Sequence, residues 1–512
     1  MKKITFAIIS VLALSACNDW LQERSPMTNT AADYFTGYGA ARQVVTAVYV
    51  PAMWEFQNTY YSEFFFGDVM SDDALKGGQN TSDMSDVYYL ENFKATDNLS
   101  IILDYYRAQY QGIARANLAV EQVSAMEKDG TLEGSLCRQL IAEARFMRAF
   151  YYFRLVRAYG AVPIVTSPIY SAEGWKVPRA ESVQKVYDEV INPDLQYAAQ
   201  NLPKKSEYAP KDLGRATQGA AQAMLLKVYL YQKNYHEAAV WGETFLRDQA
   251  SEYSLCDDYA DNFTLEGENG PESVFEIQYM REPTSDYGEG NGFTRGTFTT
   301  ILTRARSGLS GAVTGWGFNR PTHDLYNEYE DGDPRREATI LVPLPSEIKN
   351  EAEDIYMGDE LLTVKRTLYD PDTRSYPKID HDTRSPINLI VIRLADVYLM
   401  YAEACAGDND EPTGWTYINK VRSRVGLADA DRSQGFGKAL RHERRVELAM
   451  EGHRWFDLCR WGIVKETMNA YRAGESDEVK AAMSEFRDGL ELLPIPYEEV
   501  RLGGLEQNPA YK

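Results

Sequence analysis

The chain has 512 residues, 44% hydrophobic and 25% charged, which is typical of a globular protein with a sizeable core. Its 54 Lys and Arg residues are outnumbered by 76 Asp and Glu residues, and the net charge is −22. This balance excludes nucleic acid as an expected partner, because phosphate backbones are bound by clustered cations. It also excludes electrostatic attraction to an anionic membrane surface.

The N-terminus has the pattern of a secretion signal. A short apolar run, residues 4–14, follows two lysines and is too short to span a bilayer. The run ends at Cys17 in a Leu-Ser-Ala-Cys sequence that resembles the bacterial lipobox, where the signal is cut before a cysteine that becomes lipidated. We therefore expect a signal peptide over residues 1–16 and a lipid-anchored tether over residues 17–30, each buried acyl methylene contributing about 0.8 kcal/mol to membrane binding.

Helical periodicity covers much of the chain. It predicts helices over residues 31–54, 103–126, 133–159, 181–202, 218–232, 235–248, 393–406, 415–425 and 439–450. Residues 133–159 are apolar around most of the helix, so that helix should be buried. The pair 218–232 and 235–248 combines small residues, aromatics and a short turn, and resembles a tetratricopeptide helical hairpin. We expect several such pairs without a regular array.

Two stretches lack this periodicity. Residues 60–98 are rich in Gly, Asn, Asp and Ser, which predicts a loop. Between residues 252 and 388, residues 273–279 alternate like a strand, and glycine-rich runs follow. Tyr287 and Trp316 lie in or beside these runs, where few local core partners are available, so we expect exposed rings.

The common catalytic signatures are missing. His442-Glu443 begins like the HExxH motif of a zinc protease, but Val446 stands where the second histidine would be. There is no GxSxG elbow and no GxxxxGK[ST] loop, and five dispersed histidines make a metal site improbable. We expect no enzyme activity, no catalytic residues, no metal and no cofactor. Two carboxylates suffice for glycoside hydrolysis, so a glycoside hydrolase remains the less favoured alternative.

The cysteines indicate free thiols. Four cysteines follow Cys17, none of them in CxxC spacing: Cys137, Cys256, Cys405 and Cys459. Three of these lie in apolar segments that look helical, where a buried free cysteine is the expected state. A disulfide framework is therefore not expected.

A charged segment near the C-terminus, residues 441–462, is the most distinctive stretch. Glu443, Glu447 and Glu451 are four residues apart, which places them on one face of a helix. Several arginines can pair with them or with Glu403 and Asp396 on other helices. We interpret this segment as an ion-pair lattice between helices rather than as a catalytic centre.

These residues carry a family resemblance. The motifs are Leu440-Arg441-His442-Glu443-Arg444-Arg445-Val446-Glu447-Leu448-Ala449-Met450-Glu451-Gly452-His453-Arg454-Trp455-Phe456-Asp457-Leu458, Ile392-Arg393-Leu394-Ala395-Asp396-Val397-Tyr398-Leu399-Met400-Tyr401-Ala402-Glu403-Ala404, Ala142-Glu143-Ala144-Arg145-Phe146-Met147-Arg148-Ala149, Leu493-Pro494-Ile495-Pro496 and Gln507-Asn508-Pro509. Together with the lipobox they resemble the SusD/RagB family of nutrient-binding outer-membrane lipoproteins, over essentially the whole mature chain.

The resemblance implies a mainly α fold. Tetratricopeptide-like helix pairs would form a superhelical scaffold, and an irregular, loop-rich half would contain short strands. The expected regions are an N-terminal helical region over residues 31–250, a loop-rich ligand-binding region over 251–390 and a C-terminal helical region over 391–512.

The resemblance also implies a function. Family members lie as a lid over a SusC-like TonB-dependent transporter, capture oligosaccharides at the cell surface and perform no chemistry. A peptide-binding lid of RagB type is the alternative, because aromatic loops do not separate the two. In this family the ligand-binding loops match residues 68–89 and 287–316.

The candidate ligand-binding residues come from these loops and their surroundings: Asp72, Asp73, Tyr88, Tyr287, Trp316, Lys378 and Arg384. Tyr and Trp can stack on the C–H face of a sugar ring, while Asp and Arg can hydrogen-bond to hydroxyl groups near solvent. Each candidate also has a structural interpretation. Trp316 could equally pack beside Pro321, Asp72 and Asp73 could cap turns, and Lys378 and Arg384 could simply be solvated.

Overall fold

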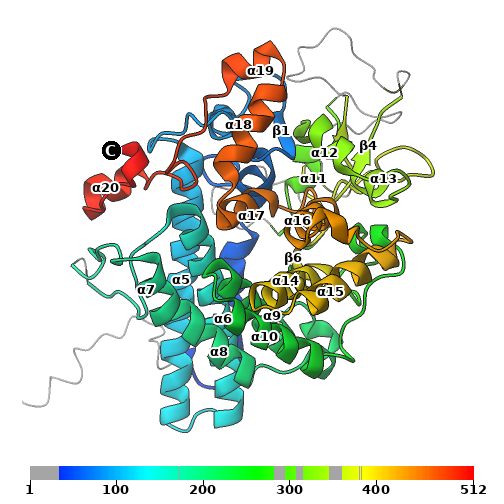
Figure 1. Ribbon diagram of the computed structural model, residues 1–512. Coiled ribbons are helices and arrows are strands. Elements are labelled where there is room, and N and C mark those ends of the chain that lie inside the picture. Colours follow the sequence, from blue (N-terminus) through cyan, green and yellow to red (C-terminus); the bar gives the residue numbers. More distant parts are fainter. Residues whose placement is uncertain are drawn as a thin grey trace, which may run out of the picture.

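The computed structural model describes residues 34–171, 173–281, 295–306, 315–344, 347, 360–379, 381 and 383–512. The fold is mainly α-helical with a few two-stranded sheets, as expected. Helices fill the lower and left parts of Figure 1, and the loop-rich half with its short strands lies at the upper right.

The helical half is a continuous series of packed helices. They are α3 (Tyr38–Tyr49), α5 (Ser100–Lys128), α6 (Gly134–Tyr159), α7 (Val183–Val186), α8 (Asn192–Asn201), α9 (Gln218–Tyr231), α10 (Tyr235–Asp248), α14 (Leu394–Gly407) and α15 (Glu411–Arg424). The predicted helices in this half are confirmed where the structure describes them, but the one predicted over 31–54 begins at Tyr38, and the one predicted over 181–202 contains the π-helix η3 (Tyr187–Ile191). Pro51 changes the end of the first one into a short 3-10 helix, η1 (Val50–Met53).

The hairpin of α9 and α10 shows why these helices begin where they do. The side chain of Thr217 accepts a hydrogen bond from the Ala220 amide at 3.0 Å, and Asn234 accepts one from the Glu237 amide at 3.2 Å. Both caps satisfy amides that the first helical turn leaves without a partner. Helix α6 is buried almost all round, as its sequence predicts.

Close helix approach in this half depends on glycine. A Cβ atom at Gly242 of α10 would lie 2.3 Å from a ring carbon of Tyr401 on α14. We expect Gly242→Ala to destabilise the protein by about 1–3 kcal/mol, because the ring must move within a packed interface. Chemical denaturation measures this, and Gly474→Ala, at a glycine with open space around it, is the control. Equal stability of the two variants would show that the interface yields easily.

The loop-rich half is built around three antiparallel strand pairs. β1 (Ala74–Gly77) pairs with β3 (Phe318–Pro321), β2 (Ser273–Ile277) with β6 (Leu389–Arg393), and β4 (Ile340–Leu341) with β5 (Leu362–Thr363). The helices of this half are short: α11 (Thr299–Thr303), α12 (His323–Glu328) and α13 (Arg335–Thr339). The strand predicted over residues 273–279 is confirmed as β2.

The prediction of a loop over residues 60–98 is wrong for part of that stretch. It contains the π-helix η2 (Phe65–Val69), strand β1 and helix α4 (Ser85–Glu91). Tertiary packing decides this local structure, because the apolar residues at the start of η2 are buried in the core. Some of the polar residues that suggested a loop, such as Asp68, Asp72 and Asp73, are buried in polar contacts instead.

The C-terminal helices pack over both halves. They are α16 (Phe436–Glu447), α17 (Arg454–Trp461), α18 (Val464–Gly474), α19 (Asp477–Ala482) and α20 (Tyr497–Gly503). Helix α16 ends at Glu447, so the expectation that Glu451 continues its acidic face is wrong. Glu451 lies in the turn that follows, and this turn touches η2: a Cβ atom at Gly67 would lie 2.1 Å from the Gly452 carbonyl oxygen.

One hydrophobic core connects these parts. Its main cluster of buried residues extends from Ala41 to Leu505 and includes members of both halves. The region boundaries at residues 250 and 390 therefore remain predictions from the sequence. Within the part of the chain that the structure describes, no helix is long and apolar enough to cross a membrane.

Candidate ligand-binding site

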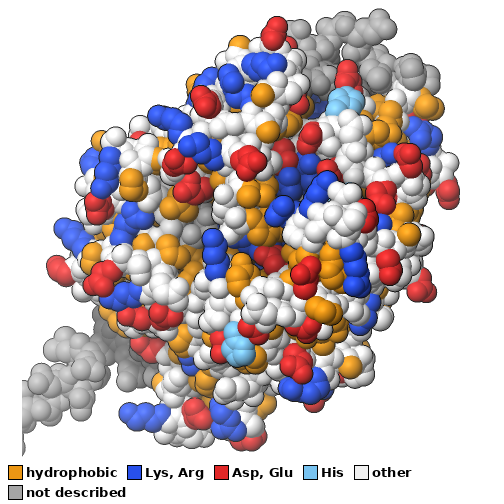
Figure 2. Space-filling view, in the orientation of Figure 1, with side chains coloured by type: hydrophobic (Ala, Val, Ile, Leu, Met, Phe, Trp, Pro, Cys, Tyr) orange, Lys and Arg blue, Asp and Glu red, His pale blue; other side chains and the backbone are white. Residues whose placement is uncertain are grey.

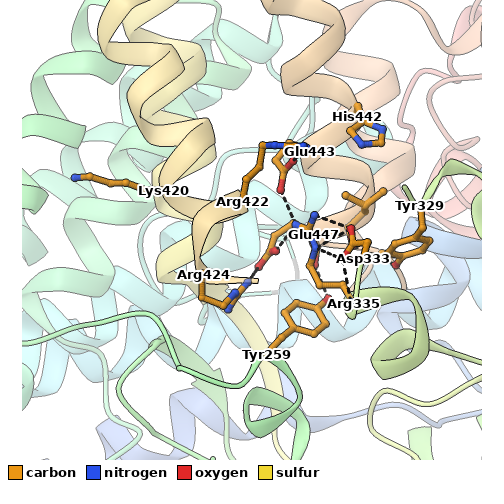
Figure 3. Close-up of polar contacts among 12 residues, drawn as sticks. Tyr259, Tyr329, Asp333, Arg335, Lys420, Arg422, Arg424, His442, Glu443 and Glu447 are labelled. Atoms are coloured by element: carbon orange, nitrogen blue, oxygen red, sulfur yellow. Dashed lines mark hydrogen bonds and ion pairs between the residues drawn. The ribbon is translucent and has the colours of Figure 1, made fainter. Parts of the chain in front are cut away.

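The acidic residues of α16 form an ion-pair lattice with arginines from several other elements (Figure 3). Both carboxylate oxygens of Glu447 accept hydrogen bonds from arginines: Arg335 at 2.8 Å, and Arg393 and Arg424 at 2.5 Å each. Glu447 is fully buried, and Arg335 also pairs with Glu443 at 2.5 Å. The lattice thus links α13, β6 and α15 to α16, which confirms the structural interpretation of this segment.

Other arginines of the same segment extend the lattice. Arg444 pairs with Asp396 of α14 at 3.0 Å, as anticipated from the sequence. Glu403 also pairs with an arginine, but its partner is Arg460, which was not anticipated. The main partners of Glu447 were not anticipated, because Arg335, Arg393 and Arg424 lie far from it in the chain.

The four cysteines after Cys17 are free thiols, as expected.

Asp72 and Asp73 belong to this lattice and not to an open surface. They are 2% and 1% exposed. The carboxylate of Asp72 accepts two hydrogen bonds from Arg454, at 2.7 and 2.8 Å, and Asp73 accepts one from Arg445 at 2.7 Å. Burial alone would raise the pKa of Asp72, but Arg445 and Arg454 outweigh it and lower the pKa to about 2. This burial favours a scaffold role over contact with a ligand.

The lattice predicts a pH-dependent mutant effect. Burial alone would raise the pKa of Glu451, but Arg393 and Lys365 lower it from 4.5 to about 2. A lowered folded-state pKa stabilises the protein above the unfolded value, and this contribution is lost as the pH falls toward 2. We therefore expect Glu451→Gln to destabilise the protein fully at pH 7 and less and less between pH 4.5 and pH 3.

Denaturant titrations of this variant and the wild type across that range measure the difference. The free energies of unfolding of the variant and the wild type must be compared at each pH. Burial raises the pKa of other acids, such as Asp68 to about 7, and these acids change the stability with pH in the opposite direction. Glu466→Gln, on the exposed side of α18, should show no pH-dependent difference. A Glu451→Gln effect of constant size down to pH 3 would contradict the lowered pKa.

A hollow of about 560 Å³ lies beside the lattice. Figure 2 shows basic side chains gathered in a hollow on this face of the molecule, near α16 and α17. His442 has a carboxylate oxygen near each ring nitrogen, from Glu328 at 2.7 Å and Glu330 at 3.3 Å. Burial lowers the pKa of His442, but the glutamates outweigh burial and raise it. No aromatic ring lines this hollow, so it offers no stacking surface for a sugar.

An aromatic cluster in the loop-rich half provides such a surface. The ring of Trp316 packs edge-on against Tyr60, with 5.4 Å between ring centroids, and Tyr60 contacts Phe298 at 5.1 Å and Phe56 at 4.7 Å. Phe298 is buried, whereas the other three side chains are half-buried. We call these four residues the aromatic platform. Large rings that keep part of their surface exposed, on irregular segments, suit stacking against the C–H face of a sugar.

The backbone around Trp316 holds this ring in place. The Trp316 amide donates to the Ile301 carbonyl of α11 at 2.8 Å, and the Gly317 amide donates to the Arg304 carbonyl at 2.9 Å. Gly317 has φ +71°, a left-handed conformation that favours glycine. The position of Trp316 therefore follows that of α11.

A polar loop, residues 77–83, lies beside the platform. The Gly78 amide donates to the Gly317 carbonyl at 2.9 Å, directly after the β1–β3 pair. Lys76 donates to the carbonyls of Gly77 and Asn80, at 2.7 and 3.1 Å, and so shapes this loop, and burial lowers the pKa of Lys76 to about 8. Residues 79–82 are exposed. The two loops that the family resemblance named, 68–89 and 287–316, thus meet through the ends of β1 and β3.

The remaining candidates are spread around this area. Tyr88 lies half-buried on α4, with its ring 5.8 Å from that of Tyr89. Arg384 is buried, with its guanidinium 5.8 Å from the Phe298 ring centroid, and therefore supports the platform from inside. Lys378 is exposed. Cys17 and Tyr287 lie outside the described residues.

Three platform residues were not among the sequence candidates. Phe56 and Tyr60 follow η1 in a short irregular segment, and Phe298 lies directly before α11. The only sequence signal for these three residues is that they are aromatic and lie in irregular segments. Only the tertiary fold places these segments together, however, because residues 56 and 298 are far apart in the chain.

A second aromatic surface lies on the helical half. A groove of about 540 Å³ runs between α5, residues 163–177 and α20, and Trp175 and Tyr170 expose 45% and 75% of their surface there. Its other walls are largely aliphatic, as at Leu118 and Ile169. The platform around Trp316 lies beside an exposed polar loop, and we take it as the first candidate for a sugar. Among the described residues, no three His, Cys, Asp or Glu side chains are grouped to hold a metal ion.

Family comparisons agree with this architecture. Residues 1–18 match the prokaryotic membrane lipoprotein lipid attachment site, and residues 19–230 match a family described as starch-binding and associating with the outer membrane. Residues 366–511 match the SusD family. These matches define a lipid-anchored protein associated with the outer membrane. Over residues 19–230 and 366–511 the chain is therefore similar to SusD-like proteins.

Individual relatives cover nearly the whole chain. SusD-like protein P25 of Formosa agariphila is 24% identical over 548 aligned positions, which cover 98% of this chain and 97% of the relative. The solved structure of a laminarin binding SusD-like protein is 28% identical, with a TM-score of 0.77, and covers 93% of this chain and 100% of that one. Surface glycan-binding protein A of Bacteroides thetaiotaomicron, solved in complex with laminarihexaose, shares the fold with a TM-score of 0.79 at 21% identity, covering 92% of this chain and 100% of that one. Two of these three relatives are described as binding proteins and none as an enzyme, which agrees with the expectation that this chain has no catalytic activity.

Proposed function

We propose that this protein is a cell-surface receptor that captures oligosaccharides and delivers them to a SusC-like TonB-dependent transporter. The half-exposed ring of Trp316, supported by Tyr60 beside an exposed polar loop, is the observation that carries the proposal. A sugar ring has an apolar C–H face, which an aromatic ring covers, and a rim of hydroxyl groups, which polar loop residues and water can bind. Weak contacts along an extended chain then add up.

Relatives support a glucan as the first ligand to test. The structural neighbour at 28% identity is a laminarin binding protein, and one matching family model is described as starch-binding. An array carrying laminarin, starch, other neutral glycans and peptides should give signal from one glycan class with the wild-type protein. Signal from peptides alone would overturn the oligosaccharide proposal and favour the peptide-binding alternative.

Delivery to a transporter needs a separate test. The lipid attachment site and the match to an outer-membrane-associated family support a location beside such a transporter. Mild detergent extraction of the outer membrane, followed by affinity capture of this protein, should recover a TonB-dependent transporter. Recovery of the receptor without any transporter, after crosslinking in intact cells, would contradict the partnership.

A further inference from the structure

The structure contains a buried carboxylate directly beneath the aromatic platform. Glu55 lies between η1 and Phe56 and is 5% exposed. No described cationic side chain is within ion-pairing distance of it, unlike the acids of the lattice. A buried carboxylate without a cation is costly to desolvate unless several hydrogen bonds hold it.

Neutral donors supply those hydrogen bonds. One oxygen of Glu55 accepts from the Thr297 hydroxyl at 2.8 Å and from the Phe298 amide at 2.6 Å. The other accepts from the Thr299 hydroxyl at 2.8 Å and from the Ser62 hydroxyl at 3.2 Å. Burial raises the pKa of Glu55, and these four hydrogen bonds only partly oppose the shift.

These bonds join the two segments that carry the platform. One segment holds Phe56 and Tyr60, and the other begins α11 and holds Phe298. The end of α11 in turn fixes Trp316, whose amide donates to the Ile301 carbonyl. A single side chain therefore determines how the rings of both segments lie relative to one another.

We propose that Glu55 is a positioning residue for oligosaccharide binding, which sets the geometry of the aromatic platform without touching the sugar. This inference rests on the proposed function. Glu55 is held by neutral hydroxyl and amide donors and not by a cation. Protonation of its carboxylate therefore changes the number of hydrogen bonds that it can accept. A protonated carboxyl must donate one hydrogen and can no longer accept all four hydrogen bonds.

Ionisable groups near Glu55 include the phenols of Tyr61 and Tyr279, and Arg384, whose guanidinium faces the Phe298 ring and pairs with His381. The charge of Glu55 acts on the phenols of Tyr61 and Tyr279, and burial raises the pKa of both phenols. Arg154 acts on both phenols, and Arg366 acts on that of Tyr279. We therefore expect acidification to weaken oligosaccharide binding more in the wild type than in Glu55→Gln, because only the wild type can gain a proton at this side chain.

Three variants test the inference. Glu55→Ala removes all four hydrogen bonds that the carboxylate accepts. Thr299→Val removes one of their donors, on the opposite segment, and leaves Glu55 itself unchanged. Glu55→Gln keeps the shape and an acceptor for the Phe298 amide while mimicking the protonated state. The probe is the neutral oligosaccharide that gives the strongest wild-type array signal, measured by isothermal titration from pH 4 to 8.

We expect Glu55→Ala to weaken binding about tenfold or more, and Thr299→Val less, because the first variant removes all four hydrogen bonds to the carboxylate and the second removes one. Glu55→Gln should bind at pH 7 as the wild type does at low pH, and its affinity should change less with pH than that of the wild type. Hydrogen exchange at the Phe298 and Trp316 amides, measured without any sugar, should accelerate in Glu55→Ala.

The outcomes separate the two proposals. If Trp316→Ala weakens binding but all three variants bind as the wild type does at every pH, the role of Glu55 is overturned. If no array sugar binds the wild type, the proposed function fails, and hydrogen exchange still decides whether Glu55 orders the platform. Unchanged exchange at both amides would overturn the positioning role in that case.

Discussion

Glu447→Ala is expected to destabilise the protein by about 3–5 kcal/mol, because it leaves buried arginines without their shared carboxylate. Glu447 accepts hydrogen bonds from Arg335, Arg393 and Arg424, all of them buried. Burial alone would raise the pKa of Glu447, but these arginines lower it well below its usual value. A loss of this size is a large part of the stability of a typical protein, so poor yield or misfolding should accompany it.

Chemical denaturation of purified protein measures the effect, and expression yield reports it where purification fails. Glu466→Ala on α18 is the matched control, since this glutamate is exposed and has no described ion-pair partner. It should change stability by less than about 0.5 kcal/mol. If Glu447→Ala folds with wild-type stability, the lattice does not hold the C-terminal helices to the loop-rich half.

Trp316→Ala is expected to weaken oligosaccharide binding about tenfold or more, with little change in melting temperature. Loss of a stacking ring at the centre of a site removes both contact area and the surface that aligns the sugar. Because Trp316 is only half-buried, its removal opens little core space. Isothermal titration with the sugar found on the array gives the affinity, and calorimetry gives the melting temperature.

Trp175→Ala provides the control for this experiment. Trp175 is a partly exposed tryptophan on the second aromatic surface, away from the platform. Its replacement should leave affinity unchanged. Weaker binding in Trp175→Ala, with wild-type affinity in Trp316→Ala, would move the site from the loop-rich half to the groove beside α5.

Much of the scaffold was predictable because it depends on local pattern. The helical periodicity of residues 133–159 and the small residues of residues 218–248 identify buried helices without any knowledge of their neighbours. The acidic spacing around Glu447 likewise indicated ion pairs. Its partners could not be predicted, since Arg335 and Arg393 reach it only through the packing of α13 and β6.

The candidate site was less predictable for a similar reason. Residues 60–98 were expected to form a loop, yet Asp72 and Asp73 are buried there, because arginines from α16 and α17 neutralise them. A turn-like composition cannot reveal such partners. Trp316 was identified by its glycine-rich surroundings, whereas Tyr60 and Phe298 join it only through long-range contacts. The hydrogen-bonded carboxylate of Glu55 beneath them leaves no mark in the local sequence.

The structure of the protein bound to an oligosaccharide tests the central claim most directly. Crystals grown with the sugar selected on the array should show a sugar ring stacked on Trp316, with its hydroxyl groups facing residues 79–83 and solvent. A sugar bound in the groove at Trp175, or in the hollow beside His442, would contradict the claim that the aromatic platform is the binding site.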